Sequence, residues 1–117
     1  MVMARINTTQ NDIDLRSSCP VACTLDLIGD RWTLLVVRDI FKGKRRYNEF
    51  LESAEHFPTN ILADRLKRLE AAAVIKKVLY SEHPPRYAYE LTNKGLELGK
   101  VVEAMYHWGN KNILGKS

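Results

Sequence analysis

Apolar residues recur every three or four positions in five segments of this chain, which is the spacing of one buried helix face. The predicted helices cover residues 19–29, 31–41, 47–54, 59–72 and the segment after Thr92 that carries Leu98, Val101, Val102, Met105 and Trp108. Asp30 is the expected cap of the second helix, and Thr92 is the expected cap of the last. That helix is expected at the centre of the core, because additional leucine and valine residues widen its inward face.

The first helix has recognisable start and stop residues. Pro20 suits the first helical position, and Gly29 ends the apolar pattern. Val21, Leu25 and Ile28 share one face, which we expect to be buried.

Two further segments, residues 74–80 and 86–91, are rich in β-branched and aromatic residues and flank the stretch SEHPP. They predict two antiparallel strands joined by a proline-containing loop. The preceding helices at 47–54 and 59–72 are joined by a tight connection, and a helix-turn-helix followed by a hairpin is a winged helix. The predicted fold class is mainly α with a small β-hairpin wing (α+β), a DNA-binding architecture.

The length of 117 residues predicts one compact domain, which we place at residues 18–117, after a flexible polar N-terminal arm at residues 1–17. No apolar run is long enough to cross a membrane and no secretory signal is recognised, so a cytoplasmic protein without a membrane partner is expected. Of a net charge of +4, the excess lies at residues 42–86, with ten basic and six acidic side chains. This indicates a surface for a polyanion, or alternatively a solvated basic face.

The helix at 59–72 presents short polar and basic side chains on its outer face, and its inward face is expected to consist of Ile61, Leu62, Leu66 and Leu69. The DNA major groove admits one α-helix, whose N-terminal residues approach the base edges. The candidate contacts to double-stranded DNA are Thr59, Asn60, Ala63, Arg65, Lys67 and Arg68. Asn60 can bond adenine through two hydrogen bonds, and the arginines can reach guanine or phosphate. Two alternatives stay open: Thr59 as a helix N-cap alone, and Arg65 paired with a carboxylate of its own chain.

Basic residues on either side extend this candidate interface. Arg86 follows the prolines of the predicted loop, where a wing tip can enter the minor groove. Lys44, Arg45 and Arg46 precede the third helix and can hold the DNA backbone. For this basic turn, simple solvation is the alternative.

Three separated segments carry a resemblance to a known family. CPVACTLDLIGDRWTLLVVRDIFKGKRRYNEF, NILADRLKRLEAAAVI and HPPRYAYELTNKG together resemble the HxlR-type winged helix-turn-helix transcriptional regulators of bacteria, over about residues 19–108. The motifs stand in the family's order. The resemblance implies a sequence-specific DNA-binding regulator, a homodimer held by its N- and C-terminal helices on a palindromic operator.

The resemblance also implies roles for single residues. The recognition-helix positions of the family fall on Thr59, Asn60 and Arg65. Its basic residue before the third helix falls on Arg46, and its wing arginine falls on Arg86.

Both cysteines are candidates for redox sensing. The N-terminal cysteine with which some family members sense oxidants or reactive electrophiles falls on Cys19, which makes a redox or small-molecule effector of unknown identity an expected partner. Cys23 stands where the family commonly has arginine, and Ala73 stands where it usually has glycine. If position 73 needs a left-handed backbone, alanine costs about 1 kcal/mol there. The alternative for the thiols is a small cap at Cys19 and a buried apolar side chain at Cys23.

The last helix carries more apolar surface than so small a core needs. Its candidate dimerisation residues are Leu98, Val101, Val102, Met105 and Trp108. A two-fold dimer would present two recognition helices to half-sites about 34 Å apart. Core packing of this helix within one chain is the alternative.

The sequence also bears on two other classes of function. The three histidines are scattered and none is near a cysteine in sequence, so we predict no enzyme, no catalytic residues, no metal and no cofactor. A winged-helix module that binds protein or RNA without operator specificity is the remaining alternative.

Overall fold

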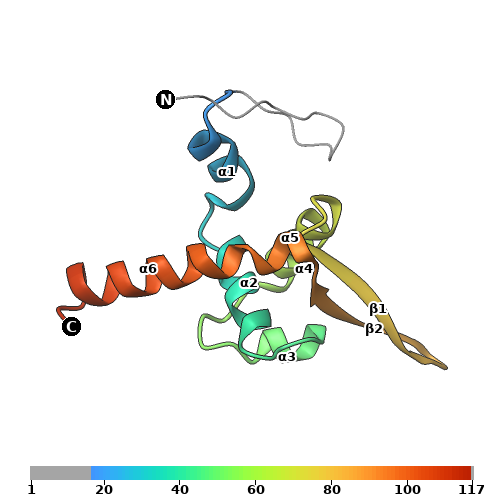
Figure 1. Ribbon diagram of the computed structural model, residues 1–117. Helices are drawn as coiled ribbons and strands as arrows, with labels where there is room; N and C mark the ends of the chain where they lie inside the picture. Colours follow the sequence, from blue (N-terminus) through green and yellow to red (C-terminus); the bar gives the residue numbers. More distant parts are fainter. Residues whose placement is uncertain (1–16, 117) are drawn as a thin grey trace.

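The computed structural model describes residues 17–116, and the arm predicted at 1–17 lies outside the described residues except for Ser17. The elements are α1 (Pro20–Ile28), α2 (Thr33–Phe41), α3 (Tyr47–Leu51), α4 (Thr59–Ala71), β1 (Ile75–Glu82), β2 (Pro85–Leu91), α5 (Asn93–Leu96) and α6 (Leu98–Asn112). Figure 1 shows the hairpin and the end of α6 pointing away from each other, with α2, α3 and α4 between them. The predicted order of helices and hairpin is confirmed.

The second helix begins two residues later than predicted. The Asp30 carboxylate accepts hydrogen bonds from the backbone N–H groups of Trp32 (3.0 Å) and Thr33 (3.2 Å). Asp30 therefore caps the helix as expected, but residues 31–32 form the capped turn and the helix begins at Thr33. α1 begins at Pro20 and is followed by Gly29, whose N–H bonds Leu25 O.

The third helix is shorter than predicted and ends at Leu51 instead of residue 54. Its start is fixed by Glu49, whose carboxylate accepts the N–H groups of Arg45 (2.7 Å) and Arg46 (2.9 Å). After Leu51 the chain turns so that Ser53 is buried. The spacing of apolar residues in the sequence does not predict that turn.

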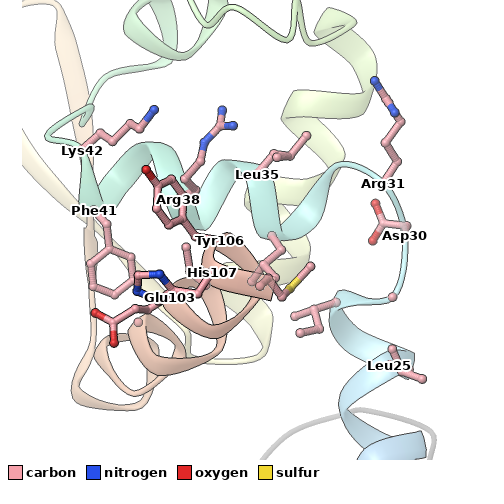
Figure 2. Close-up of a pocket in the computed structure, with 16 residues that line it drawn as sticks. Leu25, Asp30, Arg31, Leu35, Arg38, Phe41, Lys42, Glu103, Tyr106 and His107 are labelled. Atoms are coloured by element: carbon pink, nitrogen blue, oxygen red, sulfur yellow. The ribbon is translucent and has the colours of Figure 1, made fainter. Parts of the chain in front are cut away.

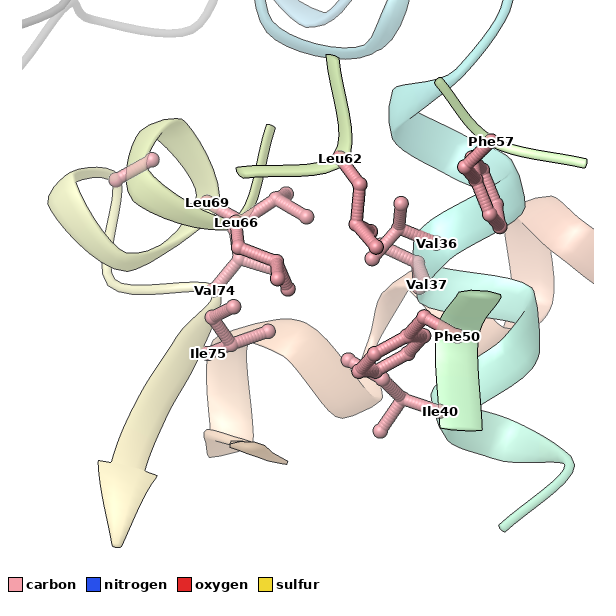
Figure 3. Packing of buried hydrophobic residues seen from close by; sticks show 11 residues of the cluster. Val36, Val37, Ile40, Phe50, Phe57, Leu62, Leu66, Leu69, Val74 and Ile75 are labelled. Carbon is pink, nitrogen blue, oxygen red and sulfur yellow. The ribbon is translucent and has the colours of Figure 1, made fainter. Parts of the chain in front are cut away.

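The core lies where α2, α3 and α4 meet the start of the hairpin (Figure 3). Its members are Val36, Val37, Ile40, Phe50, Phe57, Leu62, Leu66, Leu69, Ala72, Val74 and Ile75. Three predicted inward leucines of α4 are among them, and α2 contributes three residues, so its predicted central place is confirmed. In α1, by contrast, only Ile28 is buried, and the expectation for Val21 and Leu25 is wrong because no part of the described chain covers them.

Helix α4 ends in a left-handed turn at Ala73, with φ of 61°. The Val74 N–H bonds Leu69 O at 2.9 Å, and the Ala73 N–H bonds Glu70 O at 3.0 Å. This is the Schellman arrangement, in which glycine is usual because a Cβ is unfavourable at positive φ. The left-handed conformation considered for position 73 is confirmed.

The wing is longer than predicted because residues of the expected loop are paired. Ser81 pairs with Arg86 and Glu82 with Pro85, which leaves a two-residue turn. The register shifts between Leu79 and Ser81, so Tyr80 is the extra residue of a β-bulge.

The predicted last helix is divided in two. The Thr92 hydroxyl accepts the Gly95 N–H at 3.1 Å and caps α5. Gly95 lies against the backbone of Val74, where a Cβ would come within 2.1 Å of the Val74 oxygen. Glu97 separates α5 from α6, and the end of α6 extends away from the hairpin (Figure 1).

Candidate nucleic-acid interface

The outer face of α4 carries four of its six predicted DNA contacts. Thr59, Asn60, Ala63 and Lys67 are exposed and follow one another along the helix. Pro58 occupies the N-cap and Thr59 is the first helical residue, so the alternative of Thr59 as the N-cap is wrong. These side chains are exposed, so this face of α4 is open to contact with another molecule.

Arg65 is directed away from this face. Its Nε lies 2.8 Å from Asp30 Oδ2, its Nη1 pairs with Asp64, and its side chain is only 16% exposed. The alternative of a pair with carboxylates of its own chain is thus confirmed. A base or phosphate contact by Arg65 stays a prediction, and its guanidinium is already engaged.

The Arg68 side chain also reaches toward the turn between α1 and α2. Its Nη2 lies 3.4 Å from the carbonyl oxygens of Asp26 and Leu27 near the end of α1, and its Nη1 lies 3.9 Å from Asp30 Oδ1. The two arginines and the carboxylate therefore connect the inner side of α4 to the turn between α1 and α2.

Burial alone would raise the pKa of Asp30. Hydrogen bonds from Arg65, Thr33 and the Trp32 backbone outweigh that effect and hold the pKa of this carboxyl well below its usual range. Asp30 is therefore charged at neutral pH. Sequence reasoning recognised its capping role but missed its pairing with α4, 35 positions along the chain.

Arg46, the predicted basic residue before α3, rests on the wing. Its Cζ lies 4.2 Å from the centre of the Tyr80 ring. Tyr80 is the bulge residue, and a bulge redirects a side chain out of the strand's alternation. Neighbouring Arg45 is occupied by its own chain, since its Nη1 donates to Ile40 O (2.6 Å) and Lys44 O (2.9 Å).

The hairpin and α4 together form a concave surface that carries charges of both signs. Arg86 is exposed beside the two-residue turn. Between α4 and the hairpin lies a cleft of about 390 Å³, whose charged lining residues are Asp64, Lys67, Glu70 and Lys77. The structure thus places Thr59, Asn60, Ala63, Lys67 and the wing residues toward solvent, and turns Arg65 and Arg68 inward.

A second exposed surface lies on α6. The side chains of Met105 and Trp108 are 57% and 62% exposed, whereas Leu98 and Val102 pack against the core and Val101 is half-buried. Core packing therefore accounts for Leu98 and Val102 but not for the other apolar residues of this helix.

An apolar groove of about 950 Å³ lies between α1, α2 and α6 (Figure 2). Leu25 comes from α1, Leu35 and Phe41 from α2, and Tyr106 from α6. It is a surface on which apolar side chains can be buried by another molecule.

The cysteines lie at the start of α1, and both are half-buried and free. Cys19 occupies the N-cap, and its N–H bonds Ser17 Oγ at 3.0 Å. The Cys23 thiol donates to Ser17 O at 3.0 Å. Cys19 thus stands at the N-cap, as the alternative of a small capping residue expected. Cys23 differs from the buried apolar side chain of that alternative, because it is half-buried and its thiol is hydrogen-bonded.

Within residues 17–116 no three histidine, cysteine or acidic side chains are grouped so that they could hold a metal ion. Among the same residues no helix has the length and apolar character needed to cross a membrane.

Comparison with known proteins gives consistent matches. Residues 27–116 match the model of the family described as HxlR-like helix-turn-helix. The uncharacterized HTH-type transcriptional regulator sll1512 of Synechocystis sp. is 38% identical over 92 residues, which are 79% of this chain and 68% of that protein. The uncharacterized HTH-type transcriptional regulator YybR of Bacillus subtilis is 34% identical over 97 residues, 83% of this chain and 78% of that one.

Among solved structures, the redox regulator HypR in its oxidized form is similar, with a TM-score of 0.73 and 35% identity. The match covers 80% of this chain and 97% of HypR. The winged-helix fold class expected from the sequence is confirmed.

Proposed function

We propose, from the premise that this chain belongs to the HxlR-like helix-turn-helix family of transcriptional regulators, that it binds a two-fold symmetric DNA operator as a homodimer. The observation that carries the proposal is the outer face of α4. Thr59, Asn60, Ala63 and Lys67 are exposed along one face, and Ala63 and Lys67 share a cleft with Lys77 of the wing. Short polar side chains at the start of such a helix read base edges, and a lysine farther along holds phosphate.

Each outer residue has a distinct role. Asn60 bonds adenine, Thr59 bonds a base edge or phosphate, and Ala63 lets the helix approach a thymine methyl group closely. Lys67 contacts the DNA backbone, while Arg46 and Arg86 contact the phosphates and minor groove beside it.

Selection of binding sites from genomic DNA, followed by gel shift at several salt concentrations, tests this function. We expect symmetric half-sites about one helical turn apart and binding that weakens steeply with salt. Lys67→Ala should weaken binding to all duplexes, whereas Lys100→Ala on α6 should not. No retardation by any duplex at low salt would instead favour a protein- or RNA-binding module.

The homodimer is supported by the exposed apolar residues of α1 and α6. One recognition helix and one wing make few contacts, and a two-fold pair doubles them. In this proposal Met105, Trp108 and Val101 contact the second copy, while Leu98 and Val102 hold α6 on its own core.

Control by oxidants or electrophiles is the finer part of the proposal, and the likeness to the redox regulator HypR supports it. Cys19 at the start of α1 is the expected reactive thiol. Oxidant treatment should change operator affinity of the wild type, and Cys19→Ser should remove that response. Cys23→Ser tests the second candidate thiol separately, and an unaltered response in Cys19→Ser would refute the role of Cys19.

A further inference from the structure

The turn between α1 and α2 contacts both α4 and the segment just before it. Near the start of α4, the Trp32 ring packs on Phe57, with ring centres 5.6 Å apart. Near its middle, Arg65 binds Asp30 at 2.8 Å. Asp30 at the same time holds the N–H groups of Trp32 and Thr33, so one carboxylate joins the start of α2 to α4.

These polar contacts do something that the core leucines cannot do. Leu62, Leu66 and Leu69 bury α4, but apolar packing has little directional preference. A charge-assisted hydrogen bond from a planar guanidinium fixes both distance and orientation. The Arg65 side chain leaves the helix on the side opposite the exposed face, so its anchoring sets which way that face points.

We infer that Asp30 is a positioning residue for DNA recognition, which orients the outer face of α4 through Arg65 and ties that face to the end of α1. This inference rests on the proposed function and deepens it. Arg65 then acts inside the protein, and Asn60 and Lys67 act on DNA.

The direction in which one substitution changes DNA affinity separates the positioning role of Asp30 from simple electrostatics. DNA is a polyanion, so removing a carboxylate from the recognition module should by itself strengthen binding. If Asp30 positions α4, removing its charge weakens binding instead. Asp64 gives a matched control, because it is also paired with Arg65 but lies on the exposed side of the same helix.

The experiment is gel shift on the selected operator with Asp30→Asn and Asp64→Asn in the otherwise intact chain. Asp30 Oδ2 accepts both the α2 cap hydrogen bonds and Arg65 Nε, so asparagine can keep this acceptor, and the substitution removes the negative charge that strengthens the bond to Arg65. We expect Asp30→Asn to lose about tenfold in affinity with the salt slope unchanged, because loss of a single phosphate contact would reduce that slope by about 0.9. Asp64→Asn should bind as tightly as the wild type or more tightly. Asp30→Asn that binds with wild-type affinity or better would overturn the inference.

Arg65→Lys provides a second variant. Lysine keeps the positive charge for phosphate but loses the planar fork that reaches both carboxylates. Positioning predicts the same loss as in Asp30→Asn, with little additional loss in the double variant. Full affinity of Arg65→Lys would show that only its charge matters and would contradict the inference.

Hydrogen exchange of the free proteins gives a readout without DNA. Asp30→Asn should speed exchange of the α4 backbone amides relative to Asp64→Asn, since the helix is less firmly anchored. If the wild type bound no duplex, the proposed function would fail, but the difference in exchange rate would still test whether Asp30 anchors α4. Equal exchange in both variants would refute that anchoring role.

Discussion

Helix α4 and helix α6 are both amphipathic, yet they use their apolar residues differently. Leu62 and Leu69 of α4 are completely buried in the cluster around Val36, whereas not one of the described residues of α6 is buried. Helix α1 resembles α6, since only Ile28 is buried there. One half of the molecule is complete within its own chain, and the α1–α6 half leaves apolar side chains for another surface. The same periodic pattern thus supports a core in one place and, in our proposal, an interface in the other.

The largest expected effect is on stability, in the half of the molecule that contains α4 and the core. Leu69→Ala should lower the free energy of unfolding by about 2–5 kcal/mol, through lost apolar burial and the cavity left behind. Leu96→Ala removes the same atoms from a side chain that is 53% exposed, and should change the free energy by less than about 0.5 kcal/mol. Urea unfolding followed by circular dichroism measures both. Equal losses in the two variants would mean that the contrast in burial does not govern stability.

Trp108→Ala tests the α1–α6 half of the molecule. In the proposed dimer this tryptophan is an interface anchor, and its loss should weaken dimerisation by about 2 kcal/mol, or roughly thirtyfold. The secondary structure of the monomer should be retained, because Trp108 belongs to no buried cluster. Sedimentation over a range of concentrations measures the dissociation constant, and Tyr87→Ala on the wing is the aromatic control. A wild type that stays monomeric throughout would refute the proposed use of this surface.

A smaller effect is expected at the end of α4, where alanine has a left-handed backbone. Ala73→Gly should stabilise the fold by about 1 kcal/mol, because glycine adopts positive φ without steric cost. Ala63→Gly, within α4, should cost about 1 kcal/mol for the opposite reason. Thermal unfolding of the pair should therefore shift in opposite directions. Shifts of the same sign would show that Ala73 is not strained in solution.

Local patterns predicted much of this fold because helix faces, caps and turns depend on neighbouring residues. The core leucines of α4, the caps at Asp30 and Thr92, and the order of elements were all predicted in this way. Whether a face is buried by its own chain is not a local property, which is why Val21 and Leu25 of α1 were misjudged.

The candidate site shows the same limit. The exposed face with Asn60 and Lys67 follows from helical spacing, but the engagement of Arg65 requires a carboxylate 35 positions away. The extra residue at Tyr80 depends on how two strands pair, and the need for glycine at position 95 depends on the Val74 backbone that lies against it. Each of these is fixed by tertiary contacts, and no pattern of local residues encodes them.

The smallest predicted effect concerns an exposed aromatic residue that, unlike Trp108, already has a partner in its own chain. The Tyr80 ring lies under Arg46, and an exposed cation–π contact contributes about 0.5 kcal/mol. Tyr80→Leu should therefore weaken operator binding by roughly twofold, because Arg46 is no longer held in place before DNA arrives. In an Arg46→Ala background the same change should have no effect, and gel-shift titration of the four proteins gives the coupling. Additive losses would show that Tyr80 acts independently of Arg46, and the wing would then contact DNA without organising the loop before α3.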